Sequence, residues 1–172
     1  MKIILAAPLY PPEVGGPSQY AYKLAEAFRK LGHEVRVVRF APFRTFPSGL
    51  RHALYACALL VSSLGADAII AFDTSSVGVP AAAVSSFLGI PLIIRIGGDF
   101  LWESYVNRTG TLVPLPQFYD IAKSWNRKER AIYTRTRRLL ARAIPVFNSA
   151  WLRDIWIERY AVDPSRAHVV EN

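Results

Sequence analysis

Apolar runs of strand length alternate with helical patterns from one end of the chain to the other, and no other feature constrains the fold as strongly. Strands buried on both faces read as short continuous apolar runs, whereas helices repeat apolar residues at three- and four-residue spacing. This alternation is typical of βαβ units, which build a parallel sheet covered by helices on both faces. The sequence therefore predicts an α/β fold with a doubly wound parallel sheet. We expect its strands at residues 3–7, 34–40, 67–72, 91–96, 144–148 and 168–170.

Helical patterns fill most of the segments between these strands. The first helix should end at Gly32, and its apolar face comprises Ala21, Leu24, Ala25, Phe28 and Leu31. Residues 99–116 lack a clear period and contain Gly110, Pro114 and Pro116, so we expect a long loop there with a short helical turn. The other expected helices begin at Ser48, span residues 79–88, cover most of 117–143, and run from Ser149 to about Tyr160.

The composition suits one folded domain and excludes a disordered or fibrous protein, since 52% of the 172 residues are hydrophobic and 20% are charged. The formal net charge of +8 favours an anionic partner: nucleic acid, a phosphate-bearing small molecule or an acidic membrane surface. The single cysteine, Cys57, cannot pair within the chain, and its apolar neighbours predict a buried thiol in a reducing cytoplasm. Residues 74–94 carry no charge, but Pro80, Gly89 and Pro91 divide them, so we expect a buried helix and strand and no membrane span.

The loop after the first strand, residues 8–18, is the sharpest local feature. It lies between a strand and a helix, where a doubly wound sheet binds its ligands. Gly15 and Gly16 let the backbone approach a ligand closely, and the N–H groups at the helix start suit a phosphate. A tight turn with Ser18 as the helix N-cap explains the same residues without any ligand. The chain has neither a Gly-x-Gly-x-x-Gly dinucleotide motif nor a P-loop.

A second candidate segment, residues 95–103, follows the fourth predicted strand and should face the same edge of the sheet. Asp99 would orient a substrate hydroxyl there or act as a base. It would equally serve as the N-cap of a short helix over residues 101–105. Asp73, after the third predicted strand, has the same two interpretations: it lines the cleft or caps a turn.

Basic residues gather in the long charged helix, interleaved with aromatic and apolar side chains. This pattern suits nucleic acid or an anionic bilayer, although a solvated outer face is the commoner explanation. The three histidines are scattered and only one cysteine is present, so no metal site is expected. The basic residues are Lys123, Arg127, Lys128, Arg130, Arg135, Arg137, Arg138 and Arg142.

Several segments together form a more specific pattern than any of them alone. They are Pro12-Glu13-Val14-Gly15-Gly16, the helical residues 22–28, Leu31-Gly32-His33-Glu34-Val35-Arg36-Val37, residues 91–96 followed by Gly98-Asp99, and Val146-Phe147-Asn148-Ser149. With this combination the chain resembles the N-terminal Rossmann-like domain of a glycosyltransferase with the GT-B fold, close to glycosyltransferase family 4. The resemblance covers nearly all of the chain.

The resemblance implies roles for the matched residues. Gly15 and Gly16 would lie under the diphosphate of a nucleotide-sugar donor, and Asp99 would be the catalytic residue. The acceptor would be held by Ser18, Asn148 and Ser149. No metal or other cofactor is implied. At Gly98 the chain departs from the family, because many relatives have a histidine at that position.

The resemblance also implies a larger enzyme. Residues 1–172 would be its N-terminal, acceptor-side domain, with the C-terminal donor-binding domain absent from this chain, so the isolated domain would be inactive. The intact enzyme would be a retaining hexosyltransferase of polysaccharide biosynthesis, moving a sugar from a nucleotide-sugar to a glycan or lipid-linked acceptor. It would be cytoplasmic, with the basic helix on anionic lipid at the inner face of the membrane.

A non-catalytic α/β binding module is the alternative. Its cleft would hold a phosphorylated ligand, and its basic helix would bind nucleic acid with an affinity that falls steeply with salt. For the glycosyltransferase, no nucleic-acid partner is expected.

Overall fold

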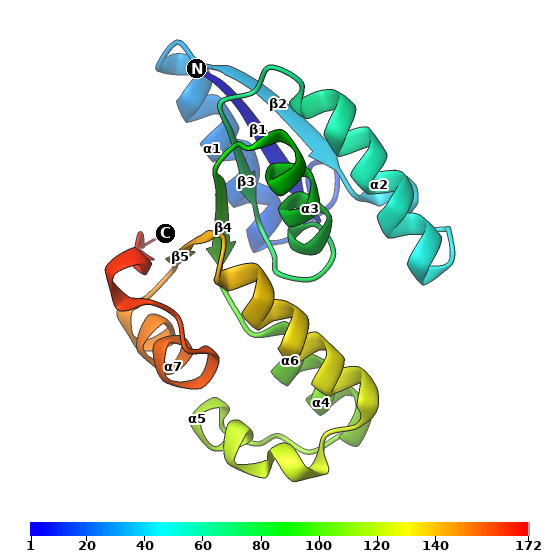
Figure 1. Ribbon diagram of the computed structural model, residues 1–172, viewed down its shortest axis with the longest axis vertical. Coiled ribbons are helices and arrows are strands. Elements are labelled where there is room, and N and C mark those ends of the chain that lie inside the picture. Colours follow the sequence, from blue (N-terminus) through cyan, green and yellow to red (C-terminus); the bar gives the residue numbers. More distant parts are fainter. Residues whose placement is uncertain (172) are drawn as a thin grey trace.

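The computed structural model describes residues 1–171 and shows an α/β fold built on one six-stranded sheet (Figure 1). The strand order is β2-β1-β3-β4-β5-β6, and neighbouring strands are parallel throughout. The predicted fold class, a Rossmann-like doubly wound parallel sheet, is thereby confirmed. The strands are β1 (Lys2–Ala7), β2 (Glu34–Arg39), β3 (Ala68–Ala71), β4 (Leu92–Ile96), β5 (Ile144–Phe147) and β6 (His168–Val169).

Helices connect the strands, since a parallel pair needs a crossover connection. The α-helices are α1 (Gly16–Lys30), α2 (Ser48–Ser63), α3 (Gly78–Leu88), α4 (Phe100–Thr109), α5 (Leu115–Phe118), α6 (Arg127–Leu140) and α7 (Ala150–Tyr160). Three short 3₁₀ helices complete the described elements: η1 (Ala41–Phe43), η2 (Tyr119–Ser124) and η3 (Pro164–Arg166).

The central strands of the sheet are buried on both faces, which explains why almost all of their residues are apolar, with Arg95 of β4 as an exception. Ile3 and Leu5 of β1 pack with Ala21 of α1 on one face. Ile4 faces the other way, into a larger core that includes Tyr55 of α2. Since the strands are parallel, the carboxyl ends of β1, β3, β4 and β5 reach the same edge of the sheet.

The prediction of a long loop over residues 99–116 is wrong, because α4 occupies most of that segment. Only Leu101 and Tyr105 of this helix are buried, too few to produce a clear apolar period in the sequence. The helix is instead bounded by its ends: Asp99 caps the first turn, and Gly110 ends the last with a left-handed φ of 70°.

The long charged helix predicted over most of residues 117–143 is interrupted. At Trp125 the backbone is extended (φ −69°, ψ 135°), and the indole ring stacks on Phe118 with ring centroids 5.0 Å apart. Asn126 then begins α6 with a capping box, in which its side chain and that of Glu129 each accept the other's backbone N–H. Burial of the indole thus ends one helix, and the cap begins the next.

The prediction of a buried Cys57 is also wrong, since the thiol is exposed. The buried face of α2 is formed by Tyr55, Leu59 and Ser62, spaced four and three residues apart. Cys57 lies two residues from Tyr55 and therefore points away from this face.

Candidate active site

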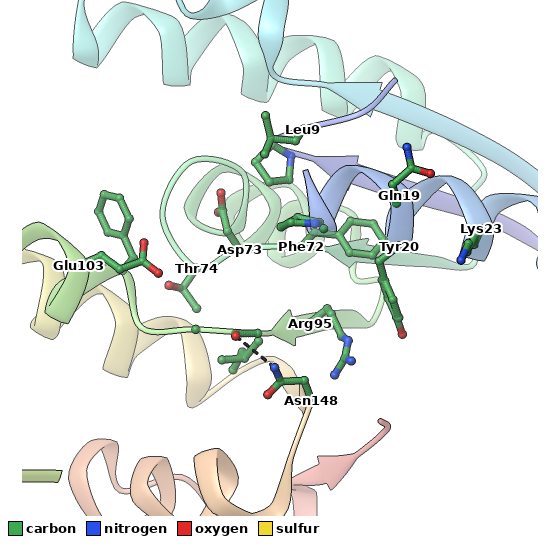
Figure 2. Close-up of a pocket in the computed structure, with 17 residues that line it drawn as sticks. Leu9, Gln19, Tyr20, Lys23, Phe72, Asp73, Thr74, Arg95, Glu103 and Asn148 are labelled. Atoms are coloured by element: carbon green, nitrogen blue, oxygen red, sulfur yellow. Dashed lines mark hydrogen bonds between the residues drawn. The ribbon is translucent and has the colours of Figure 1, made fainter. Parts of the chain in front are cut away.

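A cavity of about 590 Å³ opens at the carboxyl edge of the sheet (Figure 2). It is bounded by the loop after β1, the first turns of α1, the ends of β3 and β4, and the turn after β5. Figure 2 shows Lys23 and Arg95 toward one end of the cavity and Glu103 toward the other, so basic and acidic groups are separated along it. The polar side chains lining it are Gln19, Lys23, Asp73, Thr74, Arg95, Glu103 and Asn148, with Tyr20 adding a hydroxyl-bearing ring.

The predicted glycine pair begins α1 at the wall of this cavity. Gly15 is the N-cap residue, and its φ of 153° is one that L side chains rarely adopt. Gly16 lines the cavity, and a Cβ built there would have no heavy atom within 4 Å outside its own surroundings in the chain. The backbone at the start of α1 is therefore open to a ligand in the cavity.

Glu13 holds the glycine loop in its conformation. Its carboxylate accepts the Tyr10 N–H at 3.2 Å and forms an ion pair with Arg44, which also donates to the carbonyl of Pro8. Sequence reasoning missed Arg44, which is 31 residues from Glu13 in the chain and carries no local signal of this contact.

Ser18 is fully buried, and its hydroxyl donates to the Glu13 carbonyl at 2.6 Å. The interpretation of Ser18 as an N-cap is wrong, because α1 already begins at Gly16 and Gly15 is the cap residue. The acceptor-binding role of Ser18 stays a prediction. In this structure the Ser18 side chain stabilises the loop by its hydrogen bond to the Glu13 carbonyl.

Asp99 is 2% exposed and caps α4. Its Oδ1 accepts the N–H groups of Leu101 and Trp102, each at 3.0 Å, and its Oδ2 accepts the hydroxyl of Tyr119. Burial raises the pKa of Asp99, although these three donors oppose the shift. The capping interpretation is confirmed, and the catalytic role of Asp99 stays a prediction.

The two predicted acceptor residues after β5 lie at different places. Asn148 lines the cavity, and its amide donates to the carbonyl of Gly97 at 3.1 Å, joining the ends of β4 and β5. Ser149 is the N-cap of α7 and accepts the Leu152 N–H at 3.3 Å. Asp73 combines both interpretations offered for it, because it lines the cavity and accepts three backbone N–H groups of its own turn.

Sequence reasoning included Glu103 in the second candidate segment without giving it a role, and it missed Tyr20. Glu103 lies on α4, which was expected to be mostly loop, and it shares the cavity wall with Gly98. A Cβ at residue 98 would stand 3.1 Å from Glu103 Oε1, so this carboxylate lies in the space that a side chain at residue 98 would need. Tyr20 lies under the guanidinium of Arg95, with the ring centroid 4.8 Å from Cζ.

The basic helix is shorter than expected and lies outside this cavity. Arg135, Arg138 and Arg142 line a separate groove of about 480 Å³ beside Val79 and Ala82 of α3. Within residues 1–171, no group of three His, Cys, Asp or Glu side chains is placed to hold a metal ion.

Comparison with known proteins identifies the family. The model of Glycosyltransferase Family 4 matches residues 14–172. The chain belongs to glycosyltransferase family 4. The resemblance to an N-terminal GT-B-like domain is therefore confirmed. No curated protein matches the chain significantly.

Among solved structures, this family 4 chain is similar to UGT73P12 of Glycyrrhiza uralensis, complexed with glycyrrhetinic acid 3-O-monoglucuronide. The two share 10% sequence identity with a TM-score of 0.57, over 99% of this chain and 48% of that chain. This likeness shows the fold, and the chain spans about half the length of the UGT73P12 chain. Of the helices described in residues 1–171, none has the length and apolar character needed to cross a bilayer.

Proposed function

We propose that this chain is the acceptor-side domain of a retaining glycosyltransferase that moves a sugar from a nucleotide-sugar to a hydroxyl of a glycan or lipid-linked acceptor. The observation that carries the proposal is Gly16, which begins α1 in the wall of a cavity at the carboxyl edge of the sheet. Membership of family 4 supports glycosyl transfer in general. We further propose that the enzyme transfers a hexose, acts in polysaccharide biosynthesis and is located in the cytoplasm.

The start of α1 supplies what a departing diphosphate needs. The bond between the anomeric carbon and the diphosphate oxygen breaks while the acceptor oxygen bonds to that carbon, so negative charge grows on the leaving group. Backbone N–H groups at a helix start, at the positive end of the helix dipole, stabilise such charge. Lys23, about two turns into α1, adds a cation to the same wall and offers charge balance without a metal.

A second domain would complete the site. The chain spans 48% of the plant glycosyltransferase that it resembles in fold. We infer that the remaining donor contacts come from a C-terminal domain that closes over this cavity and excludes water, as in other enzymes that assemble their site by domain closure. Residues 1–172 alone would then not turn over.

The substitution Gly16→Val tests this proposal in the full-length enzyme. The valine side chain should extend into the cavity and keep the diphosphate from the backbone, lowering kcat/KM by on the order of 100-fold. Folding should be retained, since no heavy atom other than those of its chain neighbours and of its own helix backbone lies within 4 Å of the added Cβ. The measurement is release of nucleoside diphosphate from a panel of UDP- and GDP-sugars.

Gly49→Val is the matched control. Gly49 also lies in the first turn of a helix, α2, with no heavy atom within 4 Å of a built Cβ, and it is outside the cavity. Its substitution should leave turnover unchanged. Normal turnover of Gly16→Val would contradict the assignment of the glycine loop.

The groove between α3 and α6 supports the membrane contact expected from the sequence. The groove is lined by the apolar side chains of Val79 and Ala82 and by three cations, Arg135, Arg138 and Arg142. Such a combination suits the phosphate and upper acyl region of an anionic lipid. The full-length protein should therefore sediment with vesicles containing phosphatidylglycerol at low salt. Equal sedimentation with pure phosphatidylcholine vesicles would overturn this part of the proposal.

A further inference from the structure

The carboxylate of Glu103 lies against the face of Gly98 that has no side chain. Its Oε1 is 3.1 Å from the point where a Cβ of residue 98 would stand, which is closer than most real Cβ contacts. Both residues line the active-site cavity. Figure 2 shows Glu103 at the end opposite Lys23 and Arg95. Glycine at residue 98 thus makes the room in which this carboxylate reaches the cavity.

Glu103 differs from the two other carboxylates nearby in what its oxygens contact. Asp99 accepts two backbone N–H groups and a tyrosine hydroxyl, and Asp73 accepts three backbone N–H groups. In the part of the chain that the structure describes, no group donates a hydrogen bond to the Glu103 carboxylate. Its place in the first turn of α4 gives it only the favourable end of the helix dipole.

This environment makes the Glu103 carboxylate a strong acceptor for a ligand. Burial raises its pKa, and the charge of Asp99 raises it further. A hydrogen bond from a ligand to the ionised carboxylate would compensate both effects, and charge-assisted hydrogen bonds are the stronger kind. The ligand group must be a donor, and in a sugar-transferring site the abundant donors are hydroxyls.

We propose that Glu103 binds the acceptor, accepting a hydrogen bond from one of its hydroxyl groups, with Gly98 keeping the carboxylate in place. The proposal rests on the function proposed above and names a residue for acceptor recognition. It assigns the Glu103 end of the cavity to the acceptor, while the diphosphate lies at the start of α1.

The test compares Glu103→Gln with the wild type in the full-length protein. The probes are octyl glycosides of glucose, galactose, mannose and N-acetylglucosamine, whose binding is measured by calorimetry and needs no turnover. Glutamine keeps the shape and one oxygen acceptor but loses the charge, so binding of the best glycoside should weaken by on the order of tenfold. Glu158→Gln is the control, because Glu158 is largely exposed on α7 and outside the cavity.

The pH profile separates acceptor binding from a merely structural role. Because the pKa of Glu103 is raised, wild-type affinity should fall as the pH drops through that raised value, whereas Glu103→Gln should show no such limb. If the carboxylate only stabilised α4, Glu103→Gln would lower the melting temperature, and the pH dependence of binding would be the same in both proteins. Gly98→Ala, which displaces the carboxylate by a few tenths of an ångström, should weaken binding less than Glu103→Gln.

Each outcome decides the question. Equal affinity and an equal pH profile for wild type and Glu103→Gln would overturn the inference, as would a wild type that binds none of the glycosides. Failure of the proposed function would appear elsewhere, as normal nucleotide-sugar turnover by Gly16→Val.

Discussion

Two segments border the cavity, the loop after β1 and the turn from β4 into α4, here called the β1 and β4 corners. They are held in place by different kinds of contact. The loop after β1, residues 8–15, is shaped by backbone hydrogen bonds, by the partly exposed pair Glu13–Arg44 and by one hydrogen bond from the buried Ser18 hydroxyl, and Val14 within it is 92% exposed. The corner after β4 is held by the buried Asp99, which joins the first turn of α4 to Tyr119. Behind it lies a cluster of aromatic rings that includes Phe118 and Trp125.

The difference indicates a division of labour within the site. A loop that leaves its backbone uncovered suits a ligand recognised through N–H groups. A corner braced by buried side chains suits recognition by an oriented side chain, because its rotamers are limited by packing. The structure therefore offers backbone contacts on the α1 side of the cavity and side-chain contacts on the α4 side.

The largest expected effect on stability is that of Asp99→Ala, which removes the brace of the β4 corner. The substitution takes an acceptor from two N–H groups and from the buried Tyr119 hydroxyl, which keeps only its hydrogen bond with Tyr160. We expect a loss of about 3 kcal/mol, roughly 1 from the cap and the rest from the lost hydrogen bond between Asp99 and the buried Tyr119 hydroxyl. Urea denaturation measures it.

Asp163→Ala is the matched control for Asp99→Ala. Asp163 also caps a helix, η3, and accepts the Ser165 N–H, but it is exposed to solvent. Its substitution should change stability little. Similar losses for the two variants would show that burial of the carboxylate does not distinguish the β4 corner.

A somewhat smaller loss, about 2 kcal/mol at pH 7, is expected for Glu129→Gln. Glu129 is 1% exposed and accepts Arg108 Nε at 2.7 Å and Nη2 at 3.0 Å, joining α4 to α6 behind the corner. Burial acts to raise the pKa of Glu129, but the hydrogen bonds from Arg108 and the Asn126 N–H outweigh it and lower the pKa below the usual 4.5.

The sign of the pH dependence follows from that lowered pKa. A carboxyl group with a depressed folded pKa stabilises the protein above its unfolded pKa, and this stability is lost as the pH falls through the folded value. The difference between wild type and Glu129→Gln should therefore be largest at neutral pH and shrink at pH 3. A difference that is the same at both pH values would show that the ion pair contributes nothing.

The smallest of these effects is expected at Ser18, in the first turn of α1, whose side chain contacts the glycine loop. Ser18→Ala removes the hydrogen bond from a buried hydroxyl to the Glu13 carbonyl and should cost about 1 kcal/mol. Ser124→Ala removes the same kind of bond, from Ser124 to the Ile121 carbonyl, at an exposed site and should cost less. A loss at Ser18 as large as that at Asp99 would contradict the contrast between the two corners.

Much of the fold could be predicted because its signals are local. Residues 3–7 form an apolar run of strand length, residues 91–96 form another that is interrupted only by Arg95, and α1 repeats its apolar residues with helical spacing. The helix α4 escaped prediction because its stability depends on two caps and two buried residues, not on a full apolar stripe. Trp125 interrupts the charged helix for a tertiary reason, the packing of its ring on Phe118.

The candidate site shows the same division. The glycine pair, Asp99 and Asn148 all lie in segments that connect the end of a strand to the next helix, so the sequence alone indicated which edge of the sheet they would share. The sequence could not show which carboxylate caps the helix and which faces the cavity. Asp99 and Glu103 lie four residues apart at the same helix start, and only their packing distinguishes them.

The sequence by itself determined the α/β class, the order of the strands along the chain and the place of the glycine loop, because periodicity and glycine act over a few residues. Only the tertiary structure decided that Arg44 shapes this loop, that Tyr119 binds Asp99, and that Glu103 fills the space beside Gly98. These contacts join different elements or depend on how a helix packs. Their geometry depends on packing across the whole sheet, which no local pattern contains.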